Sequence, residues 1–105
     1  MPSLTLSTAL VLQALARHYP YGFDIIDATG LPSGTVYPIL RRLERDGLAR
    51  GRWEADDVAH REQRPQRRYY ALTAAGDSLL ADARARYPML DAMAARTARL
   101  RVSRT

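Results

Sequence analysis

Hydroxyl, phenol and guanidinium side chains that could contact nucleic acid are concentrated in one stretch, GLPSGTVYPILRRLERDGL, which runs from Gly30 to Leu48. Four apolar residues repeat there at steps of three and four, which places them on the core-facing stripe of a helix: Val36, Ile39, Leu40 and Leu43. The opposite face carries Gly34, Thr35, Tyr37, Arg41, Arg42 and Arg45. This mixture of groups suits base edges and phosphates. The stretch therefore predicts a helix that contacts DNA.

Each of these side chains also has a simpler explanation. Tyr37 could be only a surface aromatic, but its place opposite the apolar stripe favours a contact with DNA. Arg41 is expected to contact DNA as well. Arg42 and Arg45 are equally compatible with DNA contact and with solvation or pairing to an acidic neighbour such as Asp46, because exposed ion pairs are common and contribute only ~0.2 to 1 kcal/mol.

The ends of this helix are also marked in the sequence. Ser33 is a residue type that caps a helix N-terminus, and Gly47 is suited to the position just past the C-terminus. Pro38 would be tolerated within the first turn if the regular helix begins near Thr35.

A second group of basic residues follows at Arg61, Arg64, Arg67 and Arg68. One or two of them could contact phosphates or a minor groove. They could equally form a solubilising loop, which nearby acidic residues would partly neutralise. Trp53 is expected to pack on a strand rather than to form a ligand platform.

The elements that must position these groups follow a simple order. Helical spacing of apolar residues covers Thr8 to His18 and Phe23 to Ala28, and a break at Thr29-Gly30 precedes the helix described above. Residues Leu48 to Glu54 and Arg67 to Thr73 are predicted to be strands, joined by a polar loop. Three helices followed by a hairpin are the order of a winged helix-turn-helix. The fold class is thus mostly α with a small β-hairpin wing, and residues 1–73 form the expected DNA-binding domain.

The last third, residues 74–105, is expected to form a dimerisation helix with a basic tail. Apolar or small residues alternate there at steps of three and four, as in a coiled-coil seam: Leu80, Ala83, Tyr87, Leu90, Ala94 and Thr97. The winged domain could cover the first turns of this seam, but a helix of this length would project beyond a small domain at ~1.5 Å per residue, so a second copy of the chain is the economical cover. Pro88 removes a backbone donor and disfavours the α conformation at Tyr87, so we expect a kink or a break there.

Composition fits this interpretation. The chain has 105 residues and a net charge of +5, and all sixteen of its basic residues are arginine, which genomic base composition explains better than selection for binding. The absence of cysteine excludes disulfides and thiolate metal sites. We expect no metal, no cofactor and no enzymatic activity, because neither a phosphate-binding loop nor a nucleophile motif is present. Without a signal peptide or a long apolar run, the expected location is the cytoplasm, with no membrane partner.

Several segments together resemble one known family. The segments PYGFDI from Pro20 to Ile25, SGTVYPILRRLERDGL, GRWE and RRYYALTAAG resemble the PadR family of bacterial transcriptional regulators in order and spacing. The resemblance runs from about Leu4 to Leu80. Its most specific part is Gly34 to Pro38 followed by Leu40 to Glu44. The resemblance implies a repressor that binds a pseudo-palindromic operator as a homodimer and that a small hydrophobic molecule between the C-terminal helices releases.

Two sets of site residues follow from the pattern and the resemblance together. The expected contacts with double-stranded DNA are Tyr21, Ser33, Thr35, Tyr37, Arg41, Arg42, Arg64 and Arg67. The expected dimer or effector surface consists of Leu80, Ala83, Tyr87, Met89, Leu90, Met93, Ala94 and Thr97. Among these, Tyr87, Met89, Leu90 and Met93 are the candidate lining of an adaptable apolar pocket, or an ordinary dimer core. The alternative function is a winged-helix module that binds a protein or RNA.

Overall fold

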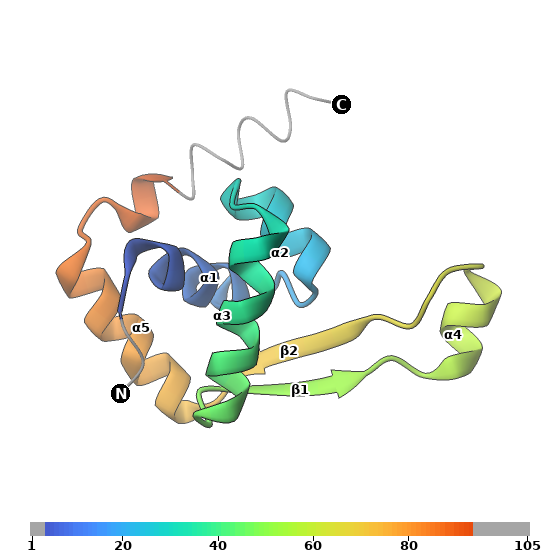
Figure 1. The fold of residues 1–105 in the computed structure, drawn as a ribbon. Coiled ribbons are helices and arrows are strands. Elements are labelled where there is room, and N and C mark those ends of the chain that lie inside the picture. Colours follow the sequence, from blue (N-terminus) through green and yellow to red (C-terminus); the bar gives the residue numbers. More distant parts are fainter. Residues whose placement is uncertain (1–3, 94–105) are drawn as a thin grey trace.

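The structure, a computed structural model, describes residues 4–93. Its elements follow in the order α1 (Leu6–Ala16), α2 (Gly22–Thr29), α3 (Ser33–Arg45), β1 (Ala49–Trp53), α4 (Asp56–Arg61), β2 (Arg68–Leu72) and α5 (Ala74–Arg86). Helices α1, α2, α3 and α5 form one cluster, and the β1–β2 hairpin extends away from it with α4 at the far end (Figure 1). This arrangement confirms the predicted winged helix-turn-helix architecture.

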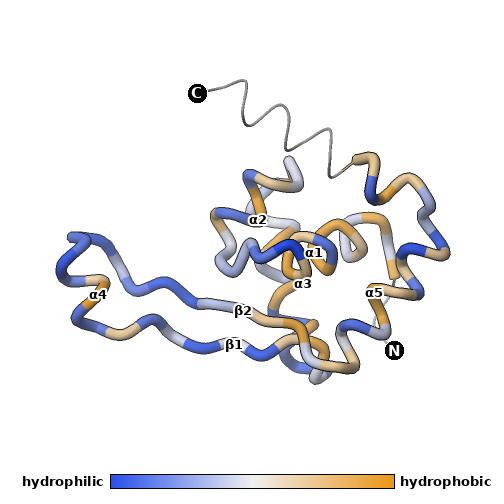
Figure 2. Tube along the Cα trace, turned by 180° about the vertical axis from the view of Figure 1, so that it is seen from behind, coloured by the Kyte–Doolittle hydropathy of each residue, from blue (hydrophilic) through white to orange (hydrophobic). Residues whose placement is uncertain are grey.

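The core lies around α1, which contacts α2, α3, α5 and β2. Thr5 caps α1, because its side-chain oxygen accepts a hydrogen bond from the Thr8 amide at 3.1 Å. The predicted apolar stripe of α3 is confirmed, since all four of its members are buried: Val36, Ile39, Leu40 and Leu43. Hydrophobic residues are concentrated in the helices of the cluster, whereas most of the hairpin beyond it is hydrophilic (Figure 2).

The two predicted strands are confirmed as an antiparallel pair. The register places Ala49 opposite Leu72 and Trp53 opposite Arg68. The link between α1 and α2 extends the sheet, because the Tyr70 amide donates to the Pro20 carbonyl at 2.8 Å and Tyr21 forms a bridge with Tyr69. The base of the wing is therefore attached to the start of α2.

Both ends of α3 can be compared with the prediction. Ser33 is not the N-cap; it is the first helical residue, and Pro32 precedes it as a cap without a side-chain hydrogen bond. Pro38 consequently lies inside the helix rather than in its first turn. It cannot donate to the Gly34 carbonyl, but Gly34 is exposed, so water can serve that carbonyl.

The C-terminal end of α3 follows the prediction. Gly47 has φ 74°, its amide donates to the Glu44 carbonyl, and the Leu48 amide donates to the Leu43 carbonyl at 2.8 Å. These two bonds form a Schellman motif, which needs a residue that tolerates positive φ.

A joint made by Gly47, Leu48, Thr73 and Gly76 connects this end of α3 to the start of α5. The Thr73 hydroxyl donates to the Gly47 carbonyl at 2.7 Å, and the Thr73 amide donates to the Leu48 carbonyl at 3.1 Å. The same hydroxyl caps α5 by accepting from the Gly76 amide. A Cβ atom on Gly76 would collide with the Leu48 carbonyl oxygen. Only glycine therefore allows the start of α5 to pack this closely against Leu48. We call these four residues the α3–α5 joint.

The connection between the strands differs from the expected polar loop, because Asp56–Arg61 forms the short helix α4. Its sequence explains the difference. Asp56 and Asp57 lie in the first turn, and His60 and Arg61 lie in the last turn, which is the charge order that the helix dipole favours.

The predicted interruption at Pro88 is confirmed as a break. Helix α5 ends at Arg86, Tyr87 has φ −124° and ψ 79°, and helical residues resume at Leu90 and continue to Met93. The break lets the chain return to the helical cluster. The Tyr87 hydroxyl donates to the Leu4 carbonyl at 3.1 Å, and the Gln13 amide nitrogen donates to an Asp91 carboxylate oxygen at 2.6 Å.

The prediction of an uncovered seam is therefore wrong for three of its residues. Leu80, Ala83 and Leu90 are buried within a single chain, with exposed fractions of 4%, 0% and 1%. All three belong to the same core as α1: Leu80 and Ala83 lie on α5, which packs against α1, and the break at Pro88 returns Leu90 to this core. Tyr87 and Met93 are half-buried and Met89 is exposed. Ala94 and Thr97 lie outside the described residues.

Candidate nucleic-acid interface

The solvent-facing side of α3 carries the predicted mixture of groups. Tyr37 and Arg41 are exposed, and Arg42 is half-buried. Of the two predicted residues in the first turn, Ser33 is exposed and Thr35 is half-buried. Arg45 instead pairs with Asp46 at 3.1 Å, and this hydrogen bond holds the pKa of Asp46 below its ordinary value. Pairing, the alternative considered for Arg45, is thus what the structure shows.

Tyr37 packs against the first residue of α2. A Cβ atom on Gly22 would lie 2.6 Å from the Tyr37 Cζ and Oη atoms, so glycine is required for the ring to occupy this position. The contact joins the N-terminal end of α2 to the N-terminal half of α3. This role of Gly22 was not predicted, although the glycine lies within the PYGFDI segment.

Three side chains form a stack beside this contact, which we call the Tyr21 stack: Tyr21, Tyr69 and Arg67. The ring centroids of Tyr21 and Tyr69 are 4.8 Å apart, with an interplanar angle of 67°. The guanidinium carbon of Arg67 lies 4.6 Å from the centroid of Tyr21. Since Tyr21 directly precedes Gly22, the surface continues from the recognition helix α3 through the start of α2 to the wing. The structure thus brings together three of the predicted DNA contacts, Tyr21, Tyr37 and Arg67.

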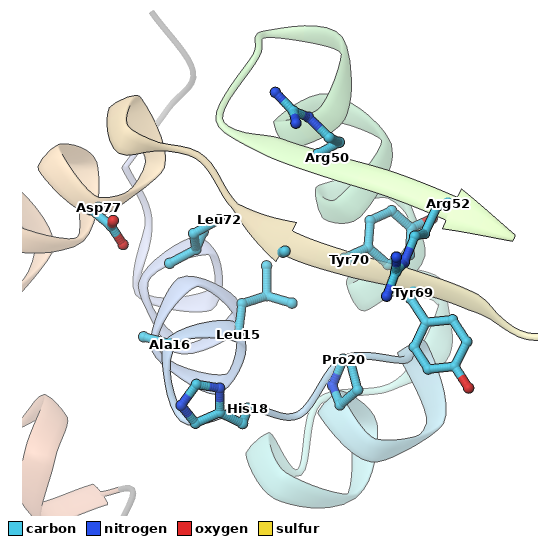
Figure 3. A pocket seen from close by; sticks show the side chains of 11 residues that line it. Leu15, Ala16, His18, Pro20, Arg50, Arg52, Tyr69, Tyr70, Leu72 and Asp77 are labelled. Atoms are coloured by element: carbon cyan, nitrogen blue, oxygen red, sulfur yellow. The ribbon is translucent and has the colours of Figure 1, made fainter. Parts of the chain in front are cut away.

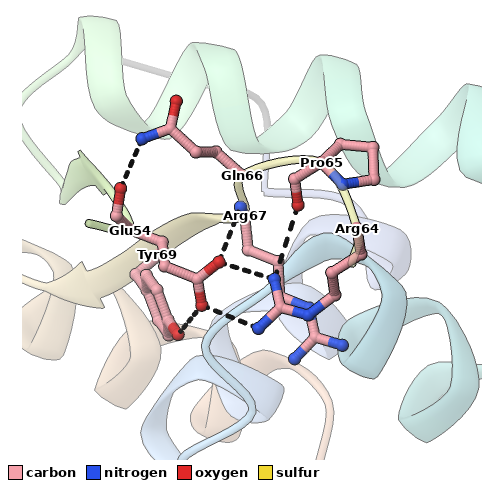
Figure 4. Close-up of polar contacts among 6 residues, drawn as sticks. All are labelled: Glu54, Arg64, Pro65, Gln66, Arg67 and Tyr69. Atoms are coloured by element: carbon pink, nitrogen blue, oxygen red, sulfur yellow. Dashed lines mark hydrogen bonds and ion pairs between the residues drawn. The ribbon is translucent and has the colours of Figure 1, made fainter. Parts of the chain in front are cut away.

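Arg64, also predicted to contact DNA, is used inside the wing instead. Its two terminal nitrogens lie 2.5 and 2.9 Å from the two carboxylate oxygens of Glu54 (Figure 4). Only 23% of the Arg64 side chain and 3% of the Glu54 side chain are exposed. The prediction for Arg64 therefore requires a correction: its guanidinium holds a buried carboxylate within its own chain.

Glu54, which was not predicted as a site residue, accepts further hydrogen bonds. The Tyr69 hydroxyl donates to it at 2.8 Å, the Arg67 amide donates at 3.4 Å, and the Gln66 side chain donates to its backbone carbonyl at 2.6 Å (Figure 4). The bonds from Arg64, together with those from Tyr69 and Arg67, lower the pKa of Glu54 to about 2 although burial opposes them. The hydrogen bond from the Tyr69 hydroxyl to Glu54 also raises the pKa of Tyr69.

A second ion pair ties α3 to the hairpin. Arg68 donates to Glu44 at 2.5 Å directly above Gly51, where a Cβ atom would lie 2.8 Å from the Arg68 Nη2 atom. The Arg68 guanidinium also lies 5.2 Å from the centroid of the Trp53 ring, which is largely exposed. Trp53 therefore packs within the wing, as predicted, through a cation contact rather than through burial.

Comparison with known proteins decides the family. The family described as the transcriptional regulator PadR-like family matches residues 11–82. The chain belongs to this family. Members of the PadR-like family are transcriptional regulators rather than enzymes. No match was found among curated proteins.

Solved structures agree with the family assignment. A PadR-like transcription factor from Bacteroides fragilis is 30% identical, with 87% of each chain covered and a TM-score of 0.60. A PadR family regulator from Clostridium difficile is 21% identical and has a TM-score of 0.68 over 88% of this chain and 97% of its own. The Bordetella bronchiseptica protein BpsR, whose DNA binding is regulated by 6-hydroxynicotinic acid, is 23% identical, with 92% and 68% covered and a TM-score of 0.60. At the two lower identities, the similarity is one of fold.

The PadR-like chain also has an open groove at the base of its wing, with a volume of about 610 Å³. It lies between the end of α1 and the hairpin, and in Figure 3 Arg52 extends across β2 near Tyr69. The lining residues are Leu15, Ala16, His18, Pro20, Arg50, Arg52, Tyr69, Tyr70, Ala71, Leu72 and Asp77. None of the four residues expected to line an effector pocket, Tyr87, Met89, Leu90 and Met93, belongs to this groove.

Residues 4–93 contain neither a metal-binding cluster nor a membrane-spanning helix. In this range no group of three or more histidine, cysteine or acidic side chains could hold a metal ion. Within the same residues, no helix combines the length and the apolar character needed to cross a membrane.

Proposed function

We propose that this PadR-like regulator is a transcriptional repressor that binds a pseudo-palindromic operator as a homodimer. The observation that carries the proposal is the continuous surface from Tyr37 on α3 through Gly22 and Tyr21 to Arg67 on the wing. A helix-turn-helix presents the N-terminal part of its second helix to the major groove, and a wing lies beside it on the duplex. Its DNA target places the protein in the cytoplasm.

Within this proposal the residues of α3 divide into two roles. Tyr37 and Arg41 contact base edges, because both are exposed on the face opposite the buried stripe. Ser33 and Thr35 at the start of the helix, and Arg42 in its last turn, contact the DNA backbone and fix the register of the helix.

The homodimer is proposed to form through the C-terminal segment. Leu80, Ala83 and Leu90 are already covered within one chain, so the surface available to a second copy begins at Met89, which is 53% exposed. Two copies related by a two-fold axis would present their recognition helices to half-sites roughly 34 to 36 Å apart. Sedimentation equilibrium at micromolar concentration tests this assembly, and a monomeric wild type would contradict it.

An effector that releases DNA is the third part of the proposal. Small hydrophobic or aromatic molecules are the proposed class, as the family resemblance implies. The groove at the base of the wing is a second place for such a molecule, because it has apolar and phenol walls together with Arg52. A ligand there would touch both the wing and α1. Titration calorimetry with an aromatic library, followed by operator titration, tests whether bound compounds lower DNA affinity.

The experiment that tests DNA binding itself is fluorescence anisotropy with random duplex at two salt concentrations. A DNA-binding protein should show a steep decrease in affinity with salt, since bound phosphates release counterions. Selection and sequencing of bound genomic fragments should then yield a palindrome. If neither result is obtained, the alternative of a protein- or RNA-binding winged-helix module is favoured.

A further inference from the structure

We propose that Glu54 is a positioning residue for DNA binding: together with Arg64 it fixes the Tyr21 stack, so that Arg67 and not Arg64 is the phosphate contact of the wing. The inference rests on the proposed DNA-binding function. It changes the role of Arg64 and gives a role to an acidic residue that lies within a basic segment.

Both carboxylate oxygens of Glu54 accept hydrogen bonds from within the chain. Oε1 of Glu54 accepts from Arg64 and from the Arg67 amide, while Oε2 accepts from Arg64 and from the Tyr69 hydroxyl. A buried carboxylate is tolerated only when it is paired and hydrogen-bonded in this way. The bidentate geometry with Arg64 is the strong, directional form of such a pair. Glu54 therefore has its acceptors occupied within the chain.

A path of contacts leads from the carboxylate to Arg67. The Glu54 amide donates to the Arg67 carbonyl at 2.8 Å, so Arg67 is bonded to Glu54 through both its amide and its carbonyl. The Tyr69 hydroxyl is held by the same carboxylate, which fixes the Tyr69 ring in its T-shaped contact with Tyr21. Tyr21 in turn lies under the Arg67 guanidinium. Each contact on this path restricts where that guanidinium can be.

Arg64 and Arg67 differ in how available they are to bind phosphate. Both terminal nitrogens of Arg64 are bonded to Glu54, so a contact with phosphate would have to disrupt that pair. The guanidinium carbon of Arg67 lies over the Tyr21 ring, and within residues 4–93 this arginine forms no ion pair. A guanidinium held by a cation–π contact uses none of its N–H donors on a carboxylate, so they remain available in the fork geometry that matches phosphate.

A pair of matched substitutions separates positioning from simple charge. Glu54→Gln and Glu62→Gln each remove one negative charge from the wing, and Glu62 is exposed. By charge alone, both should tighten binding to random duplex. We expect Glu62→Gln to tighten it by up to about twofold, whereas Glu54→Gln weakens it by about five- to tenfold and reduces the salt slope by about one. Equal tightening by both variants would overturn the proposal.

A double-mutant cycle keeps the test decisive if Glu54→Gln loosens the wing. Arg67→Ala alone should weaken binding and reduce the salt slope by about one. With Arg67 already replaced, Glu54→Gln should have the same effect as Glu62→Gln, because nothing remains to be positioned. An unchanged loss in that background would show that Glu54 acts through another group and would overturn the proposal.

Arg64→Ala provides a further comparison with Arg61→Ala, since Arg61 is an exposed arginine of α4. We expect Arg64→Ala to weaken DNA binding, and the loss should disappear when Arg67 is already absent. If Arg64→Ala and Arg67→Ala instead reduce the salt slope additively, Arg64 is itself a phosphate contact and the inference is wrong. A wild-type protein without salt-dependent duplex binding would instead reject the proposed function, which keeps the two failures distinguishable.

Discussion

The arginines of the recognition helix and those of the wing differ in their surroundings. Arg41 on α3 is exposed, and within residues 4–93 it forms no ion pair. On the wing, Arg64 is bonded to Glu54, Arg67 lies on Tyr21, and Arg68 is bonded to Glu44. Arg41 is therefore exposed without an ion pair, whereas each of these three wing arginines has a partner within the chain, so the number of basic residues in a segment does not measure how many of them are available to DNA.

The reason lies in how each region is anchored. Helix α3 buries an apolar stripe in the core, which leaves its other face free. A two-stranded hairpin has no such core beyond its base and is only marginally stable alone. In this wing, polar and cation–π contacts provide the missing anchorage.

The largest effect should come from breaking the apolar anchorage of α3. Leu40 is fully buried, so Leu40→Ala should lower the free energy of unfolding by about 2 to 5 kcal/mol. Urea denaturation monitored by far-UV circular dichroism measures the change. A loss below 1 kcal/mol would contradict the central place of this stripe.

A smaller effect is expected for the exposed face of the same helix. Arg41→Ala should cost on the order of 1 to 3 kcal/mol on the operator and much less on random duplex, because it removes a base contact. Its folding should be unchanged, since the side chain is exposed. Anisotropy titrations on both DNAs give the comparison. Equal losses would show that Arg41 fixes the register without reading sequence.

Gly22 and Gly34, near the starts of α2 and α3, differ in the space that is available for a Cβ atom. A Cβ atom on Gly34 meets nothing within 4 Å, so Gly34→Ala should stabilise the fold by roughly 0.5 to 1 kcal/mol through helix propensity. Gly22→Ala should destabilise it instead, because the new Cβ atom would displace Tyr37. Thermal unfolding of the two variants decides. The same sign for both would mean that the Tyr37 contact does not matter for stability.

The smallest predicted effect appears only at acidic pH, where the wing loses stability. Glu54 has its pKa lowered from 4.5 to about 2, so its ionised form stabilises the folded wing above pH 4.5. That contribution should be lost as the pH falls from about 4.5 through about 2. The fluorescence of Trp53 on the adjacent strand can report the change. Glu54→Gln should remove this part of the acid transition, and a wild-type transition retained in that variant would assign it to other carboxylates.

Much of the fold could be predicted from local patterns. The stripe of α3, the glycine at its C-terminus, the two strands and the break at Pro88 depend on residues close together in the sequence, where periodicity and backbone preferences decide. The position of Pro38 was not predicted, because its cost depends on how water reaches the Gly34 carbonyl.

The candidate site was harder to predict because its contacts join distant residues. Glu54 and Arg64 are brought together only by the turn through α4, and Tyr21 meets Arg67 only when the α1–α2 link joins the sheet. The covered seam shows the same limit. An apolar spacing at Leu80, Ala83 and Leu90 is identical whether α1 or a second chain covers it.

The α3–α5 joint has a kinematic consequence. Its hydrogen bonds from Thr73 to Gly47 and Leu48, with Gly76 pressed against the Leu48 carbonyl, leave no flexible segment between the two helices. We therefore expect the recognition helix and α5 to rotate as one rigid body. In a dimer held through the segment after α5, a rotation of α5 relative to the partner subunit would change the separation of the two recognition helices.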